Sequence, residues 1–250
     1  MTGTALVPQA VETEIGALAR RYRSAGGMGM AVLNAFGGQA ENLLERLPDR
    51  VKERLEGVTE RALETSMSVA AGSRGVVRDQ KSWFNTALTT AMGAAGGAGG
   101  LPSALAEIPV TTTVLLRSIQ GIAAEHGFDP DAPEIRRECL AVFGSAGPMA
   151  RDDGADMAFL SARVTLTGAT LHGVIAKVAP RFATVLGQKL AAQAVPILGA
   201  AAGAATNYAY TSYYQEMARV HFGLMKLARD SGMDREALIS ALLGEIQRQR

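Results

Sequence analysis

Glu107 is the residue of this sequence whose surroundings most suggest chemistry. It is an isolated carboxylate that follows a run, Ser82 to Ala106, without any charged side chain. A carboxylate in an apolar run is solvated at a helix end, paired with a cation, or kept protonated by burial. Two interpretations follow: a buried ion pair that joins two halves of the fold, which is the commoner arrangement, or a ligand-binding or catalytic carboxylate.

The candidate partners of Glu107 come from the second half of the chain. Arg117 follows on the same predicted helix, but ten residues rotate it onto a different face. The remaining candidates are four polar side chains: Arg163, Lys177, Lys189 and the amide of Asn207. If the carboxylate instead works in a pocket, the candidate catalytic residues are Glu107, Arg117 and His126.

Other kinds of chemistry find little support. The stretch G-A-A-G-G-A-G-G-L-P-S lacks the Gly-Lys-Ser/Thr ending of a phosphate-binding loop. Neither F-G-S-A-G nor A-G-S-R-G has the first glycine of a nucleophile elbow. The three histidines, His126, His172 and His221, lie far apart and form no H-E-x-x-H pattern. We therefore predict no metal site and no cofactor.

Composition limits the classes of function. The chain has 250 residues, 48% of them hydrophobic, and a net charge of +1, which gives no case for nucleic-acid binding. Cys139 is the one cysteine, so no internal disulfide can form, as is usual in a reducing compartment. The N-terminus has no basic segment followed by an apolar one, as a secretory signal would. We expect a cytoplasmic protein.

Hydrophobic periodicity predicts an all-α fold, a multi-helix bundle. Residues 1–81 read as amphipathic helices and residues 82–250 as a helical core, together forming one continuous domain. Pro48-Asp49 opens a clear amphipathic helix, and Asp234 caps the last one. A further helix is predicted over 110–124, with Pro109 in its first turn and Gly127 as its C-cap. The face predicted to be buried on the helix after Asp49 consists of Val51, Leu55, Val58, Ala62, Thr65 and Val69.

Two long segments carry no charge, and we expect them to form hairpin-like elements at the centre of the bundle. They are residues 82–106 and 190–215, both rich in glycine and alanine and both containing proline. Glycines allow helices to cross closely in a core, but such a segment could also rest in a membrane surface. The second run ends in a cluster of tyrosines, which fits either an interfacial belt or a core.

Residues 157–215 contain no acidic side chain. A basic surface of this kind favours anionic lipid headgroups. The candidate ligand- or lipid-binding residues are Arg163, Lys177, Arg181, Lys189 and Asn207.

Four stretches of the chain resemble the EcsC protein family. They are G-G-A-G-G-L-P-S-A-L-A-E-I-P at residues 96–109, L-L-R-S-I at 115–119, H-G-F-D at 126–129 and V-P-I-L-G-A-A-A-G-A-A-T-N at 195–207. The resemblance implies a bacterial helical protein on the cytoplasmic side of the membrane, related to a member encoded beside an ABC transporter. It implies no catalytic residues. Glu107 stands where the family pattern has aspartate, and His126 where tyrosine is common.

These features lead to one main functional hypothesis. We expect an accessory, non-enzymatic helical protein, peripheral on the inner face of a membrane, with an anionic membrane surface or a membrane protein as its partner. One alternative is a hydrolase or lipid-modifying enzyme that uses Glu107 in an apolar pocket. Another is a scaffold that forms homo-oligomers through its small-residue surfaces.

Overall fold

The computed structural model describes residues 8–35, 45, 47–73, 82–98, 100–145, 147–148, 170–193 and 199–248. In these ranges every regular element is helical, which confirms the all-α prediction. The elements are α1 (Pro8–Ala35), α2 (Asp49–Ser73), α3 (Ser82–Ala98), α4 (Gly100–Glu125), α5 (Pro133–Ala141), the 3-10 helix η2 (Val142–Gly144), α8 (Leu171–Gln193), α9 (Gly199–Ser231) and α10 (Arg235–Arg248).

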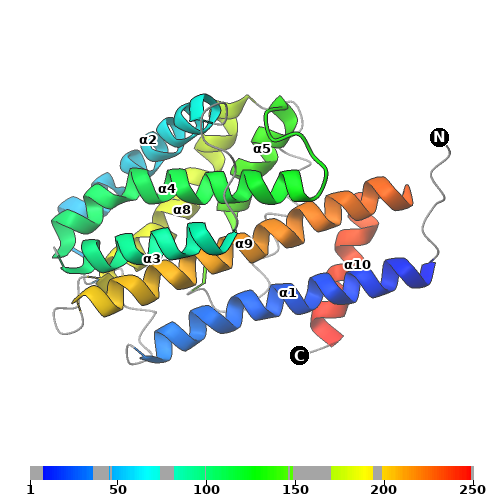
Figure 1. Ribbon diagram of the computed structural model, residues 1–250, viewed down its shortest axis with the longest axis horizontal. Helices are drawn as coiled ribbons and strands as arrows, with labels where there is room; N and C mark the ends of the chain where they lie inside the picture. Colours follow the sequence, from blue (N-terminus) through cyan, green and yellow to red (C-terminus); the bar gives the residue numbers. More distant parts are fainter. Residues whose placement is uncertain are drawn as a thin grey trace.

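Helix α9 organises the bundle. It runs through the length of the molecule, with α1 along one side and α3 and α4 along the other (Figure 1). Helix α2 packs on α4 and α8, and α10 packs on α1 and α9. A single hydrophobic cluster extends from α1 to α10 and contains residues of α2, α4, α5, α8 and α9.

Three helix ends lie where local sequence signals predict them. α2 begins at Asp49, and the amides of Val51 and Lys52 donate to the Pro48 carbonyl. Gly127 follows α4 with a φ of +79°, a conformation that favours glycine. The Asp234 carboxylate accepts bonds from the amides of Glu236 and Ala237 at 2.9 and 3.1 Å, as an N-cap should.

The buried face of α2 differs in part from the prediction. Leu55 and Ala62 are buried as expected, but Thr65 and Val69 are exposed. The buried stripe instead continues through Ser66, Met67 and Ala70. The small polar side chains are tolerated inside because each hydroxyl can bond its own helix, as Ser66 does with the Ala62 carbonyl at 2.6 Å.

Helix α4 begins earlier than predicted. It starts at Gly100 and continues through Pro109 to Glu125, so Pro109 lies inside the helix instead of at its start. An interior proline removes one backbone hydrogen bond and costs about 3 kcal/mol. The turns before Pro109 are held by tertiary contacts, because Ala104, Glu107 and Ile108 are all buried. Packing therefore outweighs the local preference of proline for a helix end.

The tyrosines of α9 are mainly core residues. Tyr210, Tyr213 and Tyr214 are buried, whereas Tyr208 is exposed. The Tyr210 hydroxyl donates to the Val185 carbonyl at 3.0 Å, and burial raises the pKa of this phenol above its ordinary value. An interfacial belt over this cluster is excluded, because only one of these tyrosines reaches the surface.

The two charge-free runs pack directly on each other, as α3 and the first half of α9. A Cβ atom on Gly93 would collide with the Gly203 carbonyl oxygen and with Asn207. Glycine is thus needed for the close crossing of these helices. The first run is not wholly central, because the outer face of α3 is exposed. Within the described ranges, no helix combines the length and hydropathy needed to cross a bilayer.

Candidate functional site

Glu107 forms a buried ion pair with Lys189. The Lys189 ammonium on α8 donates to Glu107 Oε1 on α4 at 2.9 Å. The two side chains keep only 2% and 6% of their surface exposed. Removing two charges from water costs several kcal/mol each, so such a pair is tolerated only when further hydrogen bonds complete it.

Two further donors converge on the same carboxylate oxygen. Asn207 Nδ2 donates to Glu107 Oε1 at 2.6 Å and Thr111 Oγ1 at 2.9 Å. Asn207 Nδ2 also donates to the Thr89 carbonyl at 2.7 Å. Glu107 Oε1 therefore joins α4, α8 and α9, and Asn207 extends the cluster to α3 through the Thr89 carbonyl. Arg117 is ten residues further along the same continuous α4, about 15 Å away by helical rise.

The pKa values of the two groups shift for different reasons. Burial raises the pKa of Glu107, but the charge of Lys189 and the hydrogen bonds from Asn207, Lys189 and Thr111 outweigh it, so the pKa lies below its ordinary value. Burial lowers the pKa of Lys189, and the Glu107 charge only partly opposes this. Neutralising one partner would strand the other charge in the core. We therefore take the pair as ionised at neutral pH.

The second oxygen of Glu107 has no room for a ligand on the α3 side. A Cβ atom on Gly96 would collide with Oε2. Glu107 Oε2 and Asn207 Oδ1 are buried without a hydrogen-bond partner among the described residues. This close packing is that of a structural pair, and it offers no geometric support for the enzyme that would use Glu107 in an apolar pocket.

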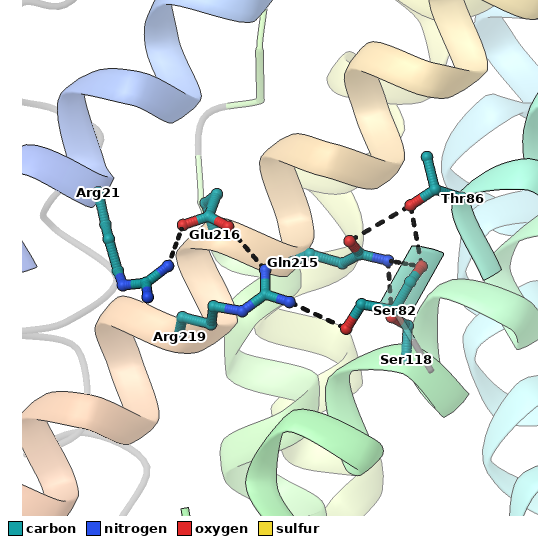
Figure 2. A network of polar contacts seen from close by, with 7 residues as sticks. All are labelled: Arg21, Ser82, Thr86, Ser118, Gln215, Glu216 and Arg219. Carbon is teal, nitrogen blue, oxygen red and sulfur yellow. Dashed lines mark hydrogen bonds and ion pairs between the residues drawn. The ribbon is translucent and has the colours of Figure 1, made fainter. Parts of the chain in front are cut away.

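A chain of polar contacts leads from this cluster along α9. The hydroxyls of Thr89 and Thr211 lie 2.7 Å apart. One turn further, Thr86 donates to Gln215 Oε1 at 3.3 Å. Gln215 Nε2 in turn donates to the Ser82 carbonyl and to Ser118 Oγ, each at 3.0 Å (Figure 2). The two charge-free segments are thus joined by hydrogen bonds between their hydroxyl and amide side chains. These bonds fix how α3 and α9 are aligned along each other.

The chain of contacts reaches the surface at two arginines. Arg219 donates to Ser82 Oγ at 2.9 Å and to Glu216 Oε1 at 2.6 Å. Arg21 on α1 donates to Glu216 Oε2 at 3.0 Å (Figure 2). The Glu216 carboxylate therefore holds two guanidinium groups beside the first residue of α3.

A pocket of about 600 Å³ opens next to these arginines, between α1, α9 and the end of α4. His126 lines it, with its Nδ1 donating to the Ile122 carbonyl at 2.7 Å. Both signs of charge surround the pocket, including Arg21, Arg219, Glu14 and Glu125. Glu107 is not among the residues that line it, so the three catalytic candidates do not meet at one site.

The candidate lipid-binding residues differ in their exposure to solvent. Lys177 is exposed and Arg181 half-buried on α8. Lys189 and Asn207 are buried in the Glu107 cluster, so their expected contact with headgroups must be revised. Arg163 lies outside the described residues.

The three histidines do not converge. His126 bonds its own helix, His221 Nε2 lies 2.8 Å from Glu138 Oε2, and His172 Nδ1 lies 3.2 Å from Glu64 Oε1. His172 nevertheless belongs to a group of three metal-ligating side chains with Glu60 and Glu64. The sequence predicted no metal site, and this group of three side chains is where that prediction can be tested.

The outer face of α3 is the feature that sequence reasoning missed. Trp83, Phe84 and Leu88 are 68%, 42% and 40% exposed. The rings of Trp83 and Phe84 meet edge to face with centroids 6.0 Å apart. Val110 on the adjoining α4 is also exposed. Leu88 follows Phe84 by four residues, which places these two side chains on one helical face, and Trp83 lies about 100° from Phe84 around the helix axis.

Comparison with known proteins gives one match. The model of the EcsC protein family matches residues 38–224, a span that includes α2, the Glu107 cluster and most of α9. No curated protein and no solved structure matches the chain.

Proposed function

The chain belongs to the EcsC protein family, and from this premise we propose that it is an accessory helical protein that binds the cytoplasmic face of a membrane. The ligand in this proposal is an anionic lipid surface, and the outer face of α3 is the contact. No reaction is assigned.

The exposed aromatic face of α3 carries the proposal. Trp83 and Phe84 stand next to each other at its start, and Leu88 follows one turn later. The whole helix, Ser82–Ala98, has no charged residue that would oppose contact with acyl chains. Burying a large apolar side chain is favourable by about 1.5–3 kcal/mol, so these three side chains offer a substantial driving force.

The residue types favour a lipid interface. Tryptophan is enriched where membrane meets water, and helices that lie in the interface plane present Trp, Phe and Leu on their apolar face. Arg219 donates to Ser82 at the start of α3, and Glu216 links Arg219 to Arg21. Each basic residue near an anionic surface adds about 1 kcal/mol. Apolar and cationic groups therefore adjoin, as binding to anionic lipid requires.

The buried side of α3 explains how its outer face is presented. Asn207 bonds the Thr89 carbonyl, and the Thr89 and Thr211 hydroxyls meet between α3 and α9. These contacts fix the rotation of α3 about its own axis. The folded protein therefore already exposes Trp83, Phe84 and Leu88, and no part of it has to unfold before it can bind lipid.

Flotation with vesicles tests the proposal. The wild type should float with vesicles that contain phosphatidylglycerol, and Leu88→Asp should not, because a carboxylate in the contact opposes both apolar burial and the anionic surface. Met233→Asp is the matched control, since Met233 is exposed between α9 and α10, away from α3. A wild type that stays in the bottom fraction overturns lipid binding. If gel filtration then gives an oligomer that Leu88→Asp dissociates, the face serves contact between copies.

A further inference from the structure

A second group of polar side chains lies where α2 packs on α8, separate from the Glu107 cluster. Glu60 and Glu64 are one turn apart on α2, and His172 stands in the first turn of α8. Each offers a donor atom, and these atoms all lie within 4.8 Å of one another. His172 Nδ1 is 3.2 Å from Glu64 Oε1.

These distances come close to those of a coordinated ion. Zinc binds imidazole nitrogen and carboxylate oxygen at about 2.0–2.2 Å in a tetrahedral arrangement, so two ligand atoms of one ion lie about 3.4 Å apart. The donor atoms lie within 4.8 Å of one another, so each side chain has to move by about 0.7 Å at most to reach this tetrahedral separation. Glu64 and His172 are exposed and Glu60 is half-buried, so the side chains can turn without repacking the core.

The charges of the group favour a cation. Like charges one turn apart on a helix repel, so Glu60 and Glu64 destabilise α2 when both are ionised. In the part of the chain that the structure describes, neither of them is ion-paired with a lysine or an arginine. The imidazole of His172 adds a nitrogen donor, which separates this group from an ordinary acidic surface.

We propose that Glu60, Glu64 and His172 bind one divalent transition-metal ion, with Zn²⁺ as the preferred ion. Three protein ligands leave the remaining coordination position to water. The mixed nitrogen and oxygen donors suit zinc, whereas a site for magnesium or calcium would be built from oxygen alone. The ion would link α2 to α8 across 108 residues of sequence. This site is independent of the lipid-binding face of α3.

Titration of the full chain with ZnCl₂ tests the site. After treatment with EDTA and dialysis, isothermal titration calorimetry of the wild type should give one saturable equivalent of Zn²⁺. The ion should also raise the midpoint of thermal unfolding, because a ligand that binds only the folded state stabilises it. Magnesium at the same concentration should produce neither effect.

Single variants identify the ligands. His172→Ala and Glu64→Gln should each weaken Zn²⁺ binding at least about tenfold, the usual scale for disturbing a metal site. Glu56→Gln is the matched control, since it removes an exposed carboxylate of α2 one turn before Glu60. Circular dichroism verifies that each variant is folded. The proposal is overturned if the wild type gives no saturable binding, or if the ligand variants bind Zn²⁺ as tightly as Glu56→Gln does.

Discussion

Lys189 Nζ lies 2.9 Å from Glu107 Oε1, and both side chains are closed off from solvent. This pair joins helices that are 82 residues apart in sequence, and Asn207 extends it to α9 and α3. The most isolated carboxylate of the sequence is thus the point at which four helices meet. Through Asn207 this carboxylate helps to hold α3 in place, with the opposite face of α3 exposed.

Glu107→Gln should destabilise the protein strongly. The substitution keeps the size of the side chain but leaves the Lys189 ammonium buried without a counter-charge, which typically costs about 3–5 kcal/mol. Urea unfolding followed by circular dichroism measures the loss. Combining Glu107→Gln with Lys189→Met should recover most of it, since the stranded charge is then removed. An unchanged urea midpoint for Glu107→Gln alone would refute the structural role of the pair.

The pair should also make stability depend on acid pH. The pKa of Glu107 is lower in the folded than in the unfolded protein, so the unfolded state takes up this proton first as pH falls. The stabilisation is therefore complete above the ordinary pKa of 4.5 and is lost as pH falls through the folded-state pKa. The unfolding free energy of the wild type should fall more steeply in this window than that of the Glu107→Gln, Lys189→Met double variant. If the unfolding free energies of the two proteins fall in parallel with pH, the pair does not cause the acid dependence.

Two glycine substitutions should act in opposite directions. Gly93→Ala places a methyl group against the Gly203 carbonyl and Asn207, and overpacking of this kind costs about 1–3 kcal/mol. Gly57→Ala on α2 meets nothing within 4 Å, and alanine is favoured over glycine in a helix by about 1 kcal/mol. Thermal unfolding should give a lower midpoint for the first variant and a higher one for the second. Equal midpoints would contradict the close crossing of α3 and α9.

Local signals in the sequence predicted much of the fold. Pro48-Asp49, Gly127 and Asp234 mark helix ends that depend on neighbouring residues alone, and all three are confirmed. The sequence also limited the possible partners of Glu107 to a few residues. A buried carboxylate needs a cation or a hydrogen-bond donor, and the second half of the chain contains few such side chains. Lys189 and Asn207 were both among them.

The remaining features depend on tertiary packing. Pro109 lies inside α4 because buried contacts of Glu107 and Ile108 hold the preceding turns, which no local rule anticipates. Trp83 is exposed because another side of α3 packs on α9. A polar face normally marks the exposed side of a helix, but α3 carries no charged residue, so its sequence does not predict which side is exposed. Glu60, Glu64 and His172 come together only because α2 packs on α8.

Trp83 provides the most direct test of the central claim, that the outer face of α3 contacts anionic lipid. It is the one tryptophan of the chain, and among the residues that the structure describes it is the most exposed large apolar side chain, so tryptophan fluorescence reports on this face alone. Adding vesicles of phosphatidylglycerol and phosphatidylcholine should shift its emission to shorter wavelength and protect it from acrylamide. Vesicles of phosphatidylcholine alone should have a smaller effect. Emission and quenching that stay the same with anionic vesicles would contradict the account.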